Sequence, residues 1–359
     1  MANLFEQKIG KKELLKRIGN INQIAYIRPI EMIEGRSKGI KAFDVNTGGG
    51  LQFSVLEGKC LDISEMKYKG INLSYLTKPG VVASEYFNPM GSEFLRFFQA
   101  GMLYTCGLRN VGAPCVDDGE ELNLHGRIGN TPAEKVGISA QWMEDEYQME
   151  ISGEMREAAM FRENLVLKRK ISTQMGAKFI KIVDEVENQG FEEQPLMILY
   201  HFNFGYPLLD NGTRILMPSL KITSRDEISE NGIKEFEKIT EPIDGFIEHV
   251  FYHEIASDAQ GYANLGIVND RLGLGVHLKY NAQQLPKLNE WKCIKSGDYT
   301  LAFEPANCNV DGRAIEKING KVHTIAPFQS AKFEIEVGIV EGIKEIKALE
   351  ECIATCRGQ

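Results

Sequence analysis

The stretch AKFEIEVGIV, residues 331–340, alternates apolar side chains with polar or small ones along most of its length. Phe333, Ile335, Val337 and Ile339 recur at every second position. Because successive side chains of a β-strand point to opposite faces of a sheet, this spacing predicts a strand with one buried face. The stretch therefore favours a β-sheet fold, in which other strands should show the same alternation.

The same period recurs through most of the chain. KFIKIVDEVENQG, residues 178–190, starts with β-branched residues at alternate positions and ends in an Asn-Gln-Gly turn signal. Further runs of this kind are LQFSVLEG, YQMEISGEM, NLVLKRKIST, PLMILYHFNF, LGLGVHLKY and YTLAFEP. Such runs return roughly every 10 to 15 residues, with Gly, Asn, Asp and Pro between them. We expect many antiparallel strands joined by short turns.

Helical patterns are few. They cover about residues 10–19, about 92–99 and the tail from about 341, where Ile343, Ile346 and Leu349 follow helical spacing. Strands outnumber helices and do not alternate with them, which argues against a doubly wound α/β sheet. The predicted fold class is all-β, a large antiparallel sandwich or barrel with a few short helices.

The chain has 359 residues, so its length alone leaves open one large domain or two fused halves. No Pro/Ser-rich linker and no repeat of fixed period divides it. We therefore expect a single domain over residues 1–359. Residues 1–45 would form an N-terminal extension with a short helix, and residues 341–359 a C-terminal, helical tail.

Composition narrows the classes of partner. The net charge is −9 and no long basic run occurs, which argues against nucleic acid. No run of about 18 apolar residues and no secretory leader is present, so we expect a cytoplasmic protein without membrane contact. The seven cysteines lack CxxC spacing, which fits reduced thiols. No phosphate-binding glycine motif and no metal motif is found, so we expect no cofactor and no metal.

Two histidines are candidates for chemistry. In LNLHGRIGN, residues 122–130, strand geometry would turn His125 and Arg127 to the same face. In LMILYHFNFGYP, residues 196–207, His201 and Asn203 share a face inside a strongly apolar strand. A lone histidine in such a place is more often a hydrogen-bonded core residue than a catalyst.

Two glutamates and a tryptophan complete the candidates. Glu304, in LAFEPANC, follows apolar residues and precedes Pro305, which favours an extended backbone. Burying a carboxylate is costly unless it is paired, so Glu304 marks a pair or a site. Glu248, in DGFIEHVF, is equally compatible with an ordinary solvated strand face. Trp291, beside Lys292 in LNEWKC, either stacks on a sugar ring or belongs to the core.

Taken in chain order, LHGRIGN, YHFNFGYP, IEHVF and AFEPAN resemble the motifs of the aldose 1-epimerases, or galactose mutarotase-like proteins. The likeness covers nearly the whole chain. TCGLRNVGAP, HGRIGNTPAE, YHFNFGYPLLD and EPAN resemble an uncharacterised branch of aldose 1-epimerase-like proteins, a domain of unknown function. The resemblance implies a galactose mutarotase-like β-supersandwich of roughly 25 to 30 strands.

The resemblance also implies an activity, the interconversion of α and β anomers of a sugar without a cofactor. Glu304 resembles the general base and His201 the general acid. His125 looks like a substrate-orienting residue and Glu248 like the acidic residue that binds sugar hydroxyls. Asn203 and Trp291 complete the expected substrate contacts.

The chain departs from the family pattern at Glu248, where an aspartate is usual, and at Arg127, which replaces the second glycine of HGG. Arg109 lies roughly where the family has a substrate-contacting arginine. Arg127, Arg109 and Lys292 could together recognise an anionic sugar. The alternative is that Arg127 pairs with an internal carboxylate such as Glu248.

Other functions stay open. A non-catalytic sugar-binding or sensing protein could use the same scaffold, because a fold does not determine function. A lyase or a glycoside hydrolase would also need two facing carboxylates, which Glu248 and Glu304 could supply. The expected partner is a monosaccharide or a sugar derivative, and exposed sheet edges leave a homodimer open.

Overall fold

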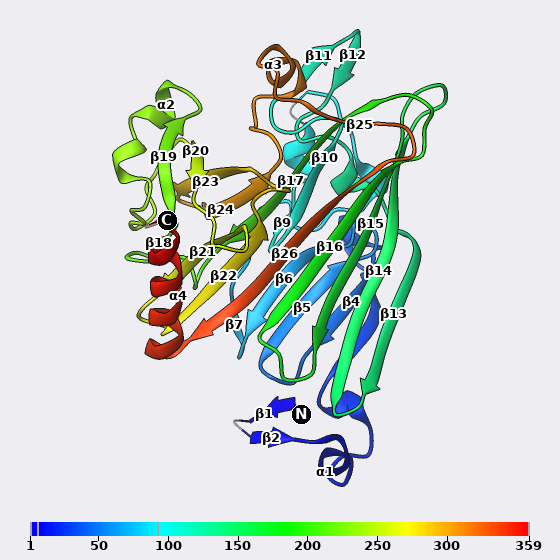
Figure 1. Ribbon diagram of the computed structural model, residues 1–359, viewed down its shortest axis with the longest axis vertical. Helices are drawn as coiled ribbons and strands as arrows, with labels where there is room; N and C mark the ends of the chain where they lie inside the picture. The colour runs from blue at the N-terminus through cyan, green and yellow to red at the C-terminus, as the bar shows by residue number, and fades with distance from the viewer. Residues whose placement is uncertain (1, 6, 92, 358–359) are drawn as a thin grey trace.

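The computed structural model describes residues 2–5, 7–91 and 93–357. Within these residues the chain forms 26 strands and four α-helices, and nearly all of the strands belong to three large antiparallel sheets. Figure 1 shows the long, twisted strands running side by side down the molecule, with the helices at its margins. This confirms the predicted all-β fold of the galactose mutarotase-like type, with a few short helices.

The first sheet has five strands and the second has eight. In spatial order the five-stranded sheet comprises β3 (Tyr26–Glu31), β4 (Lys41–Asn46), β5 (Leu51–Leu56), β6 (Asp62–Tyr68) and β7 (Ile71–Asn72). The eight-stranded sheet comprises β13 (Glu134–Met143), β14 (Glu146–Ala158), β15 (Asn164–Gln174), β16 (Phe179–Asn188), β26 (Ser330–Glu341), β22 (Leu274–Asn281), β21 (Tyr262–Asn269) and β18 (Arg214–Leu216).

The third sheet carries the candidate site. Its order is β10 (Tyr104–Leu108), β17 (Gln194–Phe204), β24 (Asp298–Ala306), β23 (Lys287–Lys295), β20 (His249–Ile255) and β19 (Ser219–Ser224), with β25 (His323–Ile325) also paired to β17. Three two-stranded sheets pair β1 (Ala2–Leu4) with β2 (Gln7–Ile9), β8 (Tyr75–Leu76) with β9 (Ala100–Gly101), and β11 (Cys115–Asp117) with β12 (Glu120–Leu122).

The helices confirm some sequence expectations and correct others. The C-terminal tail forms α4 (Gly342–Arg357), as the helical spacing predicted. The helix expected over 10–19 is only α1 (Lys11–Leu15), and the segment expected over 92–99 forms a 3₁₀ turn, η4 (Glu93–Arg96). Two short helices that the sequence did not suggest are α2 (Glu227–Glu230) and α3 (Arg313–Ile318). Among the described residues, none of these helices is long and apolar enough to cross a membrane.

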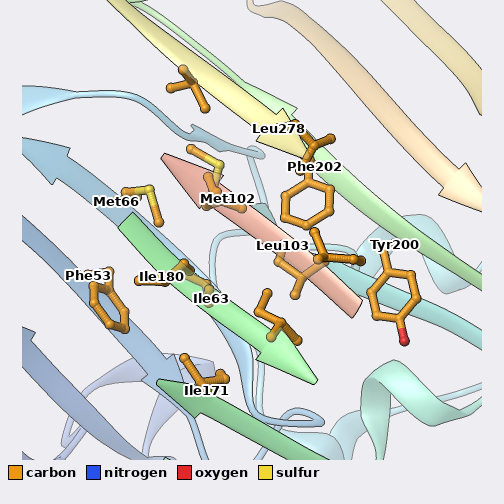
Figure 2. Packing of buried hydrophobic residues seen from close by; sticks show 14 of the residues in the cluster. Phe53, Ile63, Met66, Met102, Leu103, Ile171, Ile180, Tyr200, Phe202 and Leu278 are labelled. Atoms are coloured by element: carbon orange, nitrogen blue, oxygen red, sulfur yellow. The ribbon is translucent and has the colours of Figure 1, made fainter. Parts of the chain in front are cut away.

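The main core lies between the three large sheets. The inward-facing side chains of the strands fill this core, because every second side chain of a strand points to the same face of its sheet. In β26, Phe333, Ile335, Val337 and Ile339 are all at most 5% exposed, so the opening stretch does form a strand with one buried face. Figure 2 shows Phe53 and Ile63 from the five-stranded sheet, Ile171 and Leu278 from the eight-stranded sheet, and Phe202 from the third sheet in one cluster.

A buried ionic network fixes the core face of β17. The Arg169 side chain, fully buried, bonds the Asp62 carboxylate at 2.7 Å and the Asp184 carboxylate at 2.6 Å. The Tyr200 hydroxyl donates to the same Asp184 carboxylate at 2.7 Å. Because strand neighbours point to opposite faces, anchoring Tyr200 in the core directs the next residue, His201, to the other face of the sheet.

Candidate functional site

A cavity of about 920 Å³ opens on the face of the third sheet that turns away from the main core. Strands β17, β24, β23 and β20 provide its floor, and loops between strands provide its walls. A satellite apolar cluster that includes Phe94, Phe98, Leu199 and Val250 packs around it. The polar side chains of the lining include those of His125, His201, Arg225, Glu248, Glu304 and Asp311.

His201 and Glu304 meet on the floor. Their side chains are 5% and 3% exposed, and the distance between His201 Nε2 and Glu304 Oε1 is 3.0 Å. The backbone register explains the contact: β17 and β24 run antiparallel and pair Phe202 with Phe303, so the preceding and following residues face each other. Phe202 and Phe303 themselves fill the core on the opposite face. Alternation in two adjacent strands thus creates the pair.

Burial sets the protonation of this pair. It lowers the pKa of His201 well below the ordinary histidine value, and the neighbouring His125 acts in the same direction. Burial raises the pKa of Glu304 well above the ordinary carboxyl value; the Glu248 carboxylate adds to this and the Arg225 cation opposes it. Both shifts favour neutral groups, because a desolvated charge is costly. In the neutral pair the Glu304 carboxyl holds a proton that the lone pair of His201 Nε2 can accept.

His125 lies beside the pair, in a turn. Sequence analysis expected LNLHGRIGN to be a strand, but β12 ends at Leu122 and a 3₁₀ turn, η5 (Ile128–Asn130), follows. His125 adopts φ +58°, a left-handed conformation, which swings its ring over the cavity. The ring lies 6.0 Å from that of His201 and 5.4 Å from that of Phe94, measured between centroids.

The protonation state of His125 follows from its surroundings. The backbone N–H of Gly112 donates to Nδ1 at 3.4 Å, so Nε2 carries the proton of the neutral ring. Burial lowers the pKa of His125 to about 4, with a smaller contribution in the same direction from the Arg225 cation. At neutral pH His125 thus presents an N–H donor and not a cation.

Trp291 and Glu248 form one wall. The Trp291 indole N–H donates to Glu248 Oε2 at 2.6 Å, and the indole ring lies 5.4 Å from the His201 ring and 6.4 Å from that of Phe98. Glu248 directly precedes β20 and keeps its side chain 46% exposed. An aromatic face next to a carboxylate combines an apolar platform with a hydrogen-bond acceptor, which is how amphipathic rings are bound.

The sequence did not point to several polar residues of the lining, among them Arg225 and Asp311. Arg225 follows β19, its guanidinium is held by the Asp226 carboxylate at 2.8 Å, and it lies 3.8 Å from Glu248. Asp311 precedes α3 and accepts a hydrogen bond from the Tyr252 hydroxyl at 2.7 Å. Both residues sit in ordinary polar loop sequence. His201 and Glu304 stand out because they interrupt apolar runs. Arg225 and Asp311 do not, so the sequence pattern does not distinguish them.

The structure does not bring Arg127 and Arg109 to this cavity, which corrects the sequence expectation. Arg127 is exposed and borders a separate depression with Glu121, because the turn at 123–127 directs it away from His125. Within the residues that the structure describes, Arg127 forms no ion pair with Glu248. Arg109 bonds the carboxylates of Glu120 at 2.7 Å and Glu163 at 2.9 Å, on the lining of another pocket. The positive charge of Arg109 is therefore neutralised by these two carboxylates, away from the candidate site.

Lys292 and Asn203 are also placed outside the lining. Lys292 follows Trp291 in β23 and therefore faces the opposite side of the sheet, where its ammonium donates to the carbonyls of Glu235 and Lys238, each at 2.7 Å. Asn203 is fully buried two residues after His201, and its amide donates to the His201 carbonyl at 2.8 Å. Asn203 thus supports the backbone of β17 and does not line the cavity.

The arrangement suits proton transfer. A histidine and a glutamate are in contact at the floor, a neutral histidine donates from the side, and a tryptophan and a carboxylate form the wall. Within the described part of the chain, no group of three or more His, Cys, Asp or Glu side chains could hold a metal ion. The residues present can therefore bind hydroxyl groups and move protons between them.

Comparison with known proteins gives a family and a fold. Residues 37–339 match the family model described as a domain of unknown function, DUF4432. No curated protein matches the chain. Among solved structures, a candidate aldose 1-epimerase from Klebsiella pneumoniae has 24% sequence identity and a TM-score of 0.89, with 95% of this chain and 91% of that chain covered.

More distant structures share the fold. A galactose mutarotase-like protein from Clostridium acetobutylicum has 16% identity and a TM-score of 0.62, over 89% of this chain and all of that chain (100%). Galactose 1-epimerase from Lactobacillus acidophilus has 13% identity and a TM-score of 0.57, again over 89% and 100%. At such identities the likeness concerns the fold alone. The chain thus has a galactose mutarotase-like fold and belongs to the DUF4432 family.

Proposed function

We propose that the cavity binds the cyclic hemiacetal form of a sugar and that the protein is an aldose 1-epimerase, which interconverts α and β anomers. The observation that carries the proposal is the 3.0 Å contact between His201 Nε2 and Glu304 Oε1 at the floor of an open cavity. Mutarotation needs one group that accepts a proton and one that gives a proton, within reach of the same ring.

In the proposed reaction Glu304, as carboxylate, takes the proton of the anomeric hydroxyl while His201, as imidazolium, protonates the ring oxygen. The bond between the anomeric carbon and the ring oxygen breaks, and an open-chain aldehyde forms. Rotation of the aldehyde and closure on its other face reverse both transfers. The carboxylate–imidazolium form has the same proton count as the neutral pair, so one internal proton transfer across the 3.0 Å contact prepares it.

The remaining side chains would hold the sugar. His125 donates from Nε2 to a ring hydroxyl, and Glu248 accepts from another. The Trp291 face packs on the C–H face of the ring. Arg225 keeps positive charge near both carboxylates, which supports the ionised form of Glu304 during the reaction. Positioned acid–base groups of this kind contribute roughly 10² to 10⁴ in rate.

The charge of the lining supports an uncharged sugar. The cations proposed from sequence for anion recognition, Arg109, Arg127 and Lys292, lie elsewhere. Among the described residues, three cations border the cavity: the Arg225 guanidinium is bound by Asp226, Lys78 is bound by Asp298 at 2.6 Å, and Lys295 lies at the end of β23. Cations that are already neutralised by carboxylates attract a sugar phosphate, sulfonate or carboxylate only weakly.

NMR exchange between α and β anomers tests the proposal on a panel of neutral aldoses. We expect the wild type to accelerate exchange of at least one sugar, and Glu304→Gln to lose roughly 10² to 10⁴ of that acceleration. The matched control is Glu254→Gln, which alters an exposed glutamate of the same sheet, on β20, that pairs with Lys221 at 3.5 Å and does not border the cavity. This control should retain the wild-type rate.

Two results would count against the assignment. If Glu304→Gln accelerates exchange as well as the wild type does, Glu304 is not the base. If the wild type accelerates exchange of no sugar in the panel but ligand-observed NMR detects binding, the protein is a sugar-binding protein on an epimerase scaffold. Exchange restricted to anionic sugars would contradict the uncharged substrate.

A further inference from the structure

Three large aliphatic side chains stand exposed around the mouth of the cavity. Leu95 is 59% exposed, Ile247 58% and Ile315 46%. They come from three separate elements, the turn η4, the loop before β20 and the helix α3, and all three border the same cavity. Apolar side chains gathered around one concavity usually mark a ligand or partner site, whereas singly scattered ones do not.

The cavity also has more room than a single sugar ring needs. Its volume of about 920 Å³ lies near the upper end of the roughly 300 to 1,000 Å³ found for sites that enclose drug-sized ligands. The acid–base pair is at the buried floor, so the reacting ring would occupy only the inner part. Apolar residues such as Pro79, Pro114 and Phe246 border the outer part, together with the charged Lys78, Asp298 and Lys295.

The occupant of this outer part should therefore be apolar and continuous with the sugar. We propose that the natural substrate is an uncharged sugar with a free anomeric hydroxyl and an apolar substituent, such as an acyl, alkyl or aryl group, on another carbon. This inference rests on the proposed function for the placement of the ring. The substituent extends from the floor toward Leu95, Ile247 and Ile315, which it covers.

A small ligand explains the site better than a second protein chain does. The three aliphatic residues border a concavity whose lining also includes Phe98 and Trp291. A protein partner would favour a broad, flat apolar face. Burial of the substituent would contribute about 0.8 kcal/mol for each methylene, so a short chain is enough to dominate affinity.

Calorimetric titration tests the inference. The probes are D-glucose, D-galactose and D-mannose, each compared with its 6-O-octanoyl ester, in which the anomeric hydroxyl stays free. We expect at least one ester to bind at least about tenfold more tightly than its parent sugar, which equals about 1.4 kcal/mol. Methyl octanoate, which has the chain without the ring, should bind at least about tenfold more weakly than that ester.

Variants test whether the tighter binding of the ester depends on the aliphatic residues at the mouth of the cavity. The double variant Leu95→Ser/Ile315→Ser should lose most of the preference for the ester while it keeps the affinity for the parent sugar. The matched control is Ile318→Ser, because Ile318 lies on the same helix α3, is 80% exposed and does not border the cavity. This control should keep the full preference.

The outcomes separate the two proposals. Equal affinity for ester and parent in every pair, equal binding of methyl octanoate, or an unchanged preference in the double variant would overturn the apolar substituent. Anomer exchange of plain sugars would then still support the epimerase. If the esters bind more tightly but no sugar exchanges faster, the epimerase fails and the apolar subsite stands. A wild-type dimer that dissociates in the double variant would identify a second copy as the occupant and overturn the inference.

Discussion

The third sheet contains two histidine–glutamate pairs of nearly equal geometry. His201 and Glu304, on β17 and β24, are 3.0 Å apart; His253 and Glu290, on β20 and β23, are 3.1 Å apart. Both pairs are buried and both join neighbouring strands. They differ in the face of the sheet that they occupy, since only the first borders the cavity.

Their surroundings differ accordingly. The second ring nitrogen of His253 bonds the Ser219 hydroxyl at 2.9 Å, so both nitrogens of this ring are engaged. Among the described residues, no partner lies within hydrogen-bonding distance of His201 Nδ1. The side chains of the second pair have no exposed surface at all. A histidine–carboxylate pair is thus a reactive site only where a ligand can reach it; elsewhere the same contact is structural.

The largest expected effect that separates the pairs is on rate. His201→Gln should reduce anomer exchange by roughly 10² to 10⁴, because it removes the proposed acid. His253→Gln should leave the rate per folded molecule within about twofold of the wild type. The measurement is NMR exchange at equal concentrations of folded protein, determined by circular dichroism. Equal losses in both variants would show that the comparison is wrong.

The free energy of unfolding should depend more on the second pair than on the first, which is the reverse of the expected effect on rate. His253→Ala leaves the fully buried Glu290 carboxylate without its partner, which costs roughly 3 to 5 kcal/mol of unfolding free energy. His201→Ala should cost less, because water from the cavity can solvate Glu304. Urea unfolding followed by circular dichroism measures both. A larger loss for His201→Ala would mean that the first pair is the structural one.

The pH profile of exchange tests the protonation of the first pair. When the pH falls, a second proton binds His201 and no acceptor remains; when it rises, Glu304 loses the shared proton and no donor remains. Burial lowers the pKa of His201 below 6.5 and raises that of Glu304 above 4.5, so kcat/KM should fall in acid only below pH 6.5. The alkaline fall should follow a pKa well above that of an ordinary carboxyl. An acid fall centred at or above pH 6.5 would contradict the burial of the pair.

Arg225 should have the smallest effect, on the position of the alkaline fall. Its cation lowers the pKa of Glu304, so Arg225→Gln should move that fall to higher pH. Arg271→Gln is the control, because Arg271 is 62% exposed and pairs with Asp210 outside the cavity. An unchanged profile in Arg225→Gln, or an equal shift in the control, would remove Arg225 from the electrostatics of the site.

Alternation made most of the fold predictable. It located strands such as β17 and β26, and it marked His201 and Glu304 as polar residues in apolar runs. Alternation also limits what a sequence can say about neighbours: Trp291 and Lys292 are adjacent in β23, so only one of them can face the cavity. Which one does so depends on the packing of the sheet, which no local pattern records.

The residues in turns were less predictable. His125 and Arg127 were expected on one strand face, but the backbone turns between them, and φ +58° at His125 has no signature in a pattern of polar and apolar residues. Arg225 borders the cavity because it directly follows the last residue of β19. Loop positions of this kind follow from the three-dimensional path of the chain, and a search for apolar runs passes over them.

The register of β17 and β24 has a consequence for divergence within the family. It places His201 opposite Glu304 through backbone hydrogen bonds, which depend little on the identity of any side chain. Leu95, Ile247 and Ile315 belong to separate segments at the mouth. With the proposed function, substitutions at these three positions would change the substrate and leave the His201–Glu304 contact in place. The scaffold thus allows the choice of substrate to evolve independently of the chemistry.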